Sequence, residues 1–221
     1  MTAIRIENVT VRYGTVTAVR GLSLDVARGE MLVLLGPSGC GKTSVMRGIA
    51  GLETPAAGRI TLADTVVFDA GRGIDVPVHR RGVGMVFQSY AIWPHKTVFQ
   101  NVAFPLRMQR LPRKEIRARV AEALELVGLA DFGSRGVSLL SGGQMQRVAL
   151  ARSVVMRPRV LLLDEPLSNL DAKLRDRLRF ELREIQQHLG LTAASLTGGA
   201  RVSVGIAPAA VHLLPAGDGA A

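Results

Sequence analysis

The 221-residue sequence has little cysteine and few aromatic residues, and these shortages exclude several classes of protein. Cys40 is the only cysteine, so no disulfide can form within the chain, and we expect a reducing, cytoplasmic setting. Aromatic residues make up only 4% of the chain, so its core must be aliphatic. No apolar run reaches the roughly 18–20 residues that a membrane-spanning helix needs, and the N-terminus does not resemble a signal peptide. Any role at a membrane is therefore expected to be peripheral.

Acidic residues are also in the minority. Lys and Arg number 28 against 18 Asp and Glu, which gives a formal net charge of +10. Much of the positive charge lies in residues 105–120 and 173–183. Such stretches fit nucleic-acid binding, or they form solvated helix faces beside a nucleotide site and near anionic lipid. Because base-stacking aromatic residues are scarce, we predict no nucleic-acid partner.

The hydrophobic periodicity indicates an α/β fold with an inserted helical part. Residues 159–166 form a short, continuously apolar segment of the kind found in buried parallel strands. The apolar positions 116, 120, 124 and 127 share one face of an expected helix. Strands are expected within 3–13, 22–36, 58–70, 81–90 and 159–166, and helices within 41–52, 98–107, 112–129, 142–156 and 172–189.

The stretch GPSGCGKTS fits the phosphate-loop pattern G-x-x-x-x-G-K-[ST]. It follows an apolar strand and opens a helix, a context that disfavours an ordinary glycine-rich turn. Glycines without a Cβ let backbone N–H groups face the phosphates, while Lys42 reaches the β- and γ-phosphates and Thr43 ligates Mg²⁺. The predicted nucleotide-binding residues are Gly36, Pro37, Ser38, Gly39, Cys40, Gly41, Lys42, Thr43 and Ser44.

Two carboxylates, Asp164 and Glu165, end the apolar strand in 159–166. In a phosphate-loop protein, the Asp at such a strand end holds Mg²⁺ directly or through water. The adjacent Glu can position or deprotonate the attacking water. The alternative is a pair of solvated acidic residues without a role, and the phosphate loop argues against it.

A second glycine turn, LLSGGQMQR at residues 139–147, also opens a helix and suits an anion. The sequence LSGGQ, together with Lys42, Asp164 and Glu165, resembles the ATP-binding cassette (ABC) ATPases, the nucleotide-binding subunits of membrane transporters. The resemblance covers residues 3 to about 192. It implies a P-loop NTPase core over 1–192, with a mostly parallel sheet flanked by helices, an antiparallel β subdomain at the N-terminal side and a helical subdomain at about 90–158.

The resemblance also implies roles for single residues. Tyr13 would stack on adenine, and Gln88 would contact both Mg²⁺ and the attacking water. The loop at 168–171, with Asp171 at its end, would cross to a partner. A head-to-tail homodimer would enclose two ATP molecules, each held by the phosphate loop of one copy and the second turn of the other. The implied catalytic residues are Glu165, Gln88 and Lys42, the Mg²⁺ ligands are Thr43, Gln88 and Asp164, and the residues facing the partner's ATP are Ser141, Gly142, Gly143 and Gln144.

Residues 76–107 are similar to the importer branch that serves ferric iron, polyamines, sulfate, maltose or phosphonates. This similarity implies an ATP-hydrolysing subunit that energises solute import at the cytoplasmic face of the inner membrane. Transmembrane permease subunits would be its direct partners, and a solute-binding protein an indirect one. Trp93 and Phe99 would either border the groove for a permease helix or belong to the core of the helical subdomain.

The end of the chain departs from this pattern. Thr197 matches a Thr-His-Asp sequence of the family, but Gly198 and Gly199 replace its histidine and aspartate. The alternative function is therefore an ATP-binding, dimerising cassette with impaired hydrolysis. We interpret His188 as a surface residue, and His212 as a poor substitute for the missing histidine. Residues 193–221 are expected to form an atypical Gly/Ala-rich tail, explained by a frameshift or truncation, in place of a C-terminal regulatory domain.

Overall fold

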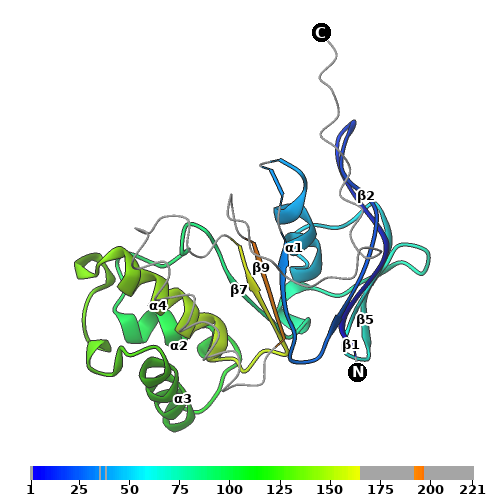
Figure 1. Ribbon diagram of the computed structural model, residues 1–221. Helices are drawn as coiled ribbons and strands as arrows, with labels where there is room; N and C mark the ends of the chain where they lie inside the picture. The colour runs from blue at the N-terminus through cyan, green and yellow to red at the C-terminus, as the bar shows by residue number, and fades with distance from the viewer. Residues whose placement is uncertain (1, 35, 38, 165–191, 197–221) are drawn as a thin grey trace.

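The computed structural model describes residues 2–34, 36–37, 39–164 and 192–196, which form two sheets and four α-helices (Figure 1). The strands are β1 (Thr2–Tyr13), β2 (Val16–Ala27), β3 (Met31–Leu34), β4 (Ala57–Leu62), β5 (Thr65–Asp69), β6 (Ile74–Asp75), β7 (Val83–Val86), β8 (Val160–Leu163) and β9 (Thr192–Leu196). The helices are α1 (Lys42–Ala50), α2 (Val98–Met108), α3 (Arg113–Leu126) and α4 (Gly142–Val154), with short 3₁₀ turns at Val78–Arg80, Ala130–Phe132 and Val137–Leu139.

The first sheet is antiparallel and has the strand order β2-β1-β4-β5-β6. Its inner face is built by apolar residues that recur every second position along β1, such as Ile4 and Ile6, both almost fully buried. Register shifts along the β1–β2 pair bend this long hairpin. After the shift between Ile6 and Val9, the alternation of buried residues resumes one residue later, at Val9 and Val11. The predicted antiparallel part at the N-terminal side is confirmed.

The second sheet has the order β3-β9-β8-β7, and all its strand pairs are parallel. Strand β8 is buried along its whole length because alternate residues enter different cores. Leu161 and Leu163 pack into the core shared with α2, α3 and α4. Val160 and Leu162 pack into the core shared with α1 and the antiparallel sheet. The continuously apolar sequence of this strand therefore follows from its central place between two cores.

Helices α2, α3 and α4 form a group beside the parallel sheet, and α1 lies between the two sheets (Figure 1). The predicted apolar face of α3 is confirmed, since Ile116, Val120 and Leu124 are all buried against the other helices. Helix α2 begins with a capping box, in which Thr97 accepts from the Gln100 N–H and the Gln100 side chain accepts from the Thr97 N–H.

The strand order places the site, because the carboxyl ends of parallel strands meet at one edge of a sheet. Strand β9 lies between β3 and β8, so the phosphate loop after β3 and Asp164 after β8 flank its carboxyl end. The helix expected at 172–189, Ser38, Glu165, Asp171, Thr197, Gly198, Gly199 and the rest of the tail lie outside the described residues. Among the described residues, no helix has the length and apolar character of a membrane span.

Candidate nucleotide site

The phosphate loop connects β3 to α1, as its sequence predicts. Gly41 is the N-cap of α1, with a left-handed backbone at φ 90°. A Cβ at Gly41 would lie 2.5 Å from the carbonyl oxygen of Ala18, so only glycine fits between the loop and β2. The N-terminus of α1 therefore opens directly into the loop, where its free N–H groups suit an anion.

Lys42 lies at the first position of α1 and folds back over the loop. Its Nζ donates to the carbonyl oxygens of Gly36 and Pro37, both at 2.8 Å, and approaches the Cys40 Sγ at 3.4 Å. The ammonium group is thus held inside the loop by backbone oxygens. A phosphate that entered the loop would meet this positive charge directly.

Thr43 and Asp164 meet across the sheet edge, although 121 positions separate them in the sequence. The Thr43 hydroxyl donates to Asp164 Oδ1 at 3.2 Å, and Asp164 is 7% exposed. The Asp164 backbone N–H donates to the carbonyl oxygen of Val86 at 2.9 Å, which joins the end of β8 to the end of β7. Two of the three predicted Mg²⁺ ligands therefore lie beside each other at the end of the phosphate loop.

Gln88 follows β7, the neighbour of β8, and its side chain is exposed. Its position near the carboxyl ends of β7 and β8 puts it on the same sheet edge as Asp164. The chain turns sharply around it, since the Tyr90 N–H donates to the Phe87 carbonyl oxygen at 2.9 Å. Gln88 thus belongs to a tight turn at the edge where the phosphate loop ends.

Tyr13, at the end of β1, contacts the helix that follows the phosphate loop. Its hydroxyl donates to a carboxylate oxygen of Glu53 and lies 3.0 Å from Ser44 Oγ. Burial, together with the hydrogen bond to Glu53, raises the pKa of Tyr13. The residue as a whole is 45% exposed, so its ring remains available beside the loop.

The second glycine turn opens α4. Ser141 is the N-cap, with its Oγ accepting from the Gln144 N–H at 3.3 Å and its own N–H donating to Gln144 Oε1 at 2.9 Å. The N–H groups of Gly142 and Gly143, at the first two helical positions, have no partner within the helix by its geometry. In Figure 1, α4 and α1 lie on opposite sides of the parallel sheet, so the helix that this turn opens is separated from the helix that the phosphate loop opens.

The arrangement of a phosphate loop, an acidic strand end and a capped SGGQ turn has a counterpart among known proteins. The sequence profile of a family described as ABC transporter matches residues 19–168. The chain belongs to this family. The predicted ABC ATPase fold is confirmed by a solved structure, cbiO1 from Clostridium perfringens, described as part of the ABC transporter complex cbiONQ. That structure has a TM-score of 0.79, is 30% identical, and matches over 90% of this chain and 79% of its own.

Curated relatives of this ABC chain are named as import ATP-binding proteins. The trehalose/maltose import protein MalK of Thermococcus litoralis is 53% identical over 89% of this chain and 53% of its own length. The spermidine/putrescine protein PotA of Rubrobacter xylanophilus is 53% identical over 88% and 50%. The Fe(3+) ions protein FbpC of Brucella suis is 52% identical over 89% and 56%. These matches confirm the resemblance to the importer branch, and the chain spans about half the length of these relatives.

Some side chains of the site carried no local sequence signal. Glu53 lies beyond α1 and reaches Tyr13, 40 positions away. Arg152 lies near the end of α4 and donates to the backbone that follows Gln88, more than 60 positions away. Nothing in the sequence near either residue distinguishes it from an ordinary surface charge, so only the fold identifies these contacts.

Trp93 and Phe99 both pack into the helical part. The Trp93 ring centroid lies 4.4 Å from that of Phe104, and the Arg152 guanidinium carbon lies 5.0 Å from the Trp93 centroid. Phe99 is partly buried against the core of the helical group. The described contacts therefore favour a packing role for both residues. His79 and His95 are exposed.

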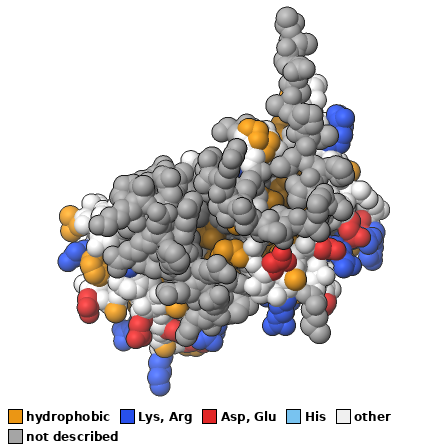
Figure 2. Space-filling model, viewed as in Figure 1, with side chains coloured by type: hydrophobic (Ala, Val, Ile, Leu, Met, Phe, Trp, Pro, Cys, Tyr) orange, Lys and Arg blue, Asp and Glu red, His pale blue; other side chains and the backbone are white. Residues whose placement is uncertain are grey.

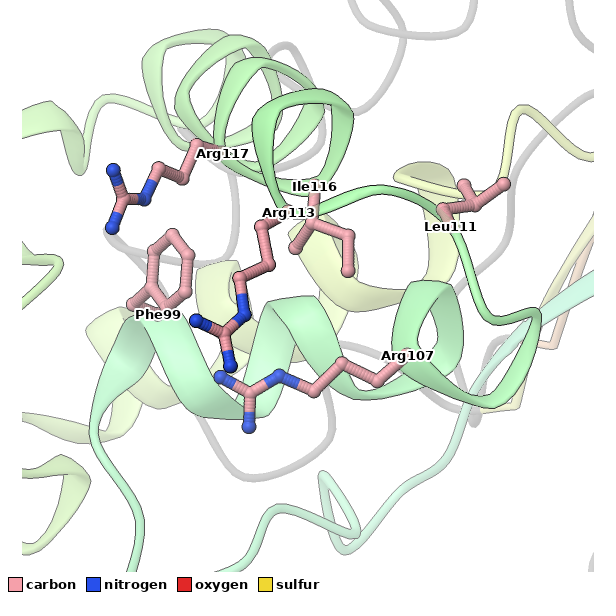
Figure 3. A pocket seen from close by; sticks show the side chains of 6 residues that line it. All are labelled: Phe99, Arg107, Leu111, Arg113, Ile116 and Arg117. Atoms are coloured by element: carbon pink, nitrogen blue, oxygen red, sulfur yellow. The ribbon is translucent and has the colours of Figure 1, made fainter.

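The basic stretch 105–120 lines most of a hollow of about 540 Å³ between α2 and α3 (Figure 3). Arg107, Arg113 and Arg117 line the hollow together with the apolar side chains of Phe99, Leu111 and Ile116. All three arginines are exposed, so water solvates their charges and the hollow is part of a basic surface rather than a closed ligand site. On the face in Figure 2, Lys and Arg side chains are interspersed with Asp and Glu side chains along the lower edge of the molecule.

Proposed function

We propose that this chain binds ATP with Mg²⁺ and hydrolyses it as the nucleotide-binding subunit of an ABC importer. The observation that carries the proposal is the Thr43–Asp164 contact of 3.2 Å at the end of the phosphate loop. A hydroxyl and a carboxylate that lie beside each other at this point would hold Mg²⁺ next to the β- and γ-phosphates of a nucleotide bound by Lys42. The importer names of the relatives support the direction of transport.

The residues present fit a magnesium ion. Mg²⁺ prefers oxygen ligands and is usually held by one or two carboxylates together with waters and substrate phosphates. Thr43 Oγ1 and Asp164 Oδ1 supply such a donor set, and no group of three or more His, Cys, Asp or Glu in the described part of the chain offers a richer metal site. Bound Mg²⁺ would neutralise charge that develops on the phosphates. Gln88 would orient the attacking water, and Glu165 would take its proton.

The separation of the two glycine turns supports a pairing of two copies. One phosphate loop leaves the γ-phosphate open on one side. The N–H groups of Gly142 and Gly143, with the Ser141 hydroxyl, suit that open side. Because α4 lies across the sheet from α1 in one chain, the turn is available to a nucleotide on a second copy in a head-to-tail pair (Figure 1).

The direct partners would be permease subunits, with the chain held at the cytoplasmic face of the inner membrane and a solute-binding protein acting indirectly. The identities to maltose, polyamine and ferric-iron relatives differ by only one percentage point. This uniformity is expected of a subunit that contacts the permease and not the solute.

The test is steady-state ATP hydrolysis with Mg²⁺, measured beside binding of a fluorescent ATP analogue. The wild-type chain and the Glu165→Gln variant are compared, and Lys42→Ala serves as the control that removes the phosphate-binding ammonium. Nucleotide binding in both of the first two proteins, with hydrolysis about 10²–10⁴-fold slower in Glu165→Gln, is the expected result. An affinity for ATP that Lys42→Ala leaves unchanged would contradict the proposal.

The second candidate is an ATP-binding cassette with impaired hydrolysis, favoured by one observation. Strand β9 ends at Leu196 between the phosphate loop and Asp164, and the sequence continues with glycine at 198 and 199. A positioned histidine there would contact the γ-phosphate, and losing such a group costs about 10²–10⁴-fold in rate. Under this candidate, Gly198→His restores hydrolysis without changing ATP affinity. Equal rates in the wild type and the variant would exclude it.

A further inference from the structure

Arg152 holds the turn that contains Gln88 onto α4. Its Nη1 donates to the Ala91 carbonyl oxygen at 2.6 Å, and its Nη2 donates to the Tyr90 carbonyl oxygen at 2.9 Å. The planar guanidinium thus engages two consecutive carbonyl groups, a geometry that a single ammonium group cannot reproduce. Its guanidinium carbon also lies over the Trp93 ring, 5.0 Å from the ring centroid.

The backbone that Arg152 binds is under strain. Tyr90 and Ala91 are consecutive non-glycine residues in the left-handed region, with φ of 60° and 48°. A side chain with a Cβ rarely adopts this backbone conformation, because the Cβ crowds the following carbonyl oxygen. The Tyr90 and Ala91 N–H groups close a tight turn by donating to the carbonyl oxygens of Phe87 and Ser89. The two charge-assisted hydrogen bonds from Arg152 stabilise this turn, and Gln88 lies inside it.

The same turn also lies close to the beginning of α4. The Tyr90 hydroxyl lies 4.0 Å from the place that a Cβ would take at Gly142. Gly142 and Arg152 are ten residues apart, about 15 Å along a helix. Tyr90 is therefore bound through its carbonyl oxygen near the end of α4, its hydroxyl lies close to the glycine turn, and its side chain packs against the core of the helical group.

We infer that Arg152 is a positioning residue that makes Gln88 and the Ser141–Gln144 turn move as one unit. This inference rests on the proposed function. In a head-to-tail pair, Gln88 acts at the nucleotide of its own chain, whereas the Ser141–Gln144 turn acts at the nucleotide of the partner. Arg152 thereby links the two nucleotide sites through α4, and its loss leaves each site to respond to ATP separately.

The variants are Arg152→Met, which keeps the bulk of the side chain, and Arg152→Lys, which keeps the charge but offers no planar fork. The matched control is Arg157→Met, which removes an exposed arginine just beyond α4 that pairs with the exposed Glu122 at 2.9 Å. Hydrogen exchange without nucleotide measures the turn directly. Amide exchange across residues 87–93 is expected to be on the order of tenfold faster in Arg152→Met, intermediate in Arg152→Lys and unchanged in the control.

The second measurement uses Trp93, the only tryptophan of the chain. In the wild type, Mg²⁺ and a non-hydrolysable ATP analogue are expected to change the iodide quenching of Trp93, and this change is expected to be lost in Arg152→Met. The affinity for ATP stays within about threefold, because Arg152 makes no contact with the phosphate loop among its described contacts. Hydrolysis falls about 100-fold, since a displaced catalytic group can cost that much, and the Hill coefficient for ATP falls toward one.

Each outcome decides the matter. Exchange at 87–93 in Arg152→Met that equals the control overturns the clamp itself. Faster exchange, combined with a wild-type tryptophan response and wild-type hydrolysis, shows a merely structural arginine and overturns the positioning role. A wild-type chain that binds no ATP refutes the proposed function instead. Hydrogen exchange without nucleotide then still tests whether Arg152 stabilises the turn at residues 87–93.

Discussion

Arg81 anchors α1, the helix that begins with the predicted phosphate-binding residues Lys42 and Thr43, and replacing it is expected to destabilise the chain. Its side chain is fully buried. Its guanidinium donates to the carbonyl oxygens of Gly48 at 2.8 Å and Ile49 at 3.1 Å, at the end of α1, and to that of Val76 at 2.6 Å. Arg81 also pairs with Asp75 at 2.7 Å. Arg81→Met therefore removes every one of these donors at once.

The size of this destabilisation depends on the groups that lose their hydrogen-bond partner when Arg81 is replaced. Burial lowers the pKa of Arg81 while the Asp75 carboxylate acts to raise it, so the pair partly offsets the cost of burying the charge. Removing one partner of a buried ion pair costs about 3–5 kcal/mol. Because Asp75 is 43% exposed, water solvates it again, and the main loss comes from the three carbonyl groups. We expect the free energy of unfolding to fall by about 4 kcal/mol.

Thermal unfolding followed by circular dichroism tests this estimate. A loss of about 4 kcal/mol corresponds to a decrease in Tm of about 8–16 °C for a chain of this size. Arg81→Lys keeps the charge but reaches fewer carbonyl groups, so it should lose about half as much. The control is Arg5→Met, which breaks an exposed pair with Asp25 worth less than about 1 kcal/mol. Equal decreases in Arg81→Met and Arg5→Met would refute the reasoning.

Two further predictions concern a helix cap and a buried carboxylate. Thr97→Ala removes the capping box of α2 and should lower the free energy of unfolding in urea by about 1 kcal/mol, whereas Thr97→Ser should retain it. Burial acts to raise the pKa of Asp69, but hydrogen bonds from Arg59 and from the Arg72 N–H outweigh it and lower the pKa. The stability that Asp69 contributes is therefore present above its unfolded pKa and lost as the pH falls through its lower folded pKa. Acid unfolding below about pH 4, the unfolded pKa of an aspartate, should be steeper in the wild type than in Asp69→Asn, and equal slopes would contradict this assignment.

The sequence alone predicted several features that depend on neighbouring residues. The phosphate loop between β3 and α1, the apolar face of α3 and the helix that follows Ser141 all lie where periodicity and glycine spacing predict them. Local patterns are enough to predict these features because the periods of helices and strands repeat over a few residues. The glycines and the lysine of a phosphate loop likewise lie within one short, contiguous motif. The sequence LSGGQ, together with Lys42, Asp164 and Glu165, likewise carried the resemblance to the ABC family, which the family profile confirms.

Only the tertiary structure decided which distant residues meet. The order β3-β9-β8-β7 brings Thr43 to Asp164, and nothing in either segment specifies that β9 lies between them. Arg152 and Arg81 resemble other arginines in the sequence, because a guanidinium group acquires its role from the carbonyl groups that the fold places around it. Strand order and such contacts depend on how two cores pack against both faces of one sheet, and that is a property of the whole chain and not of any short segment.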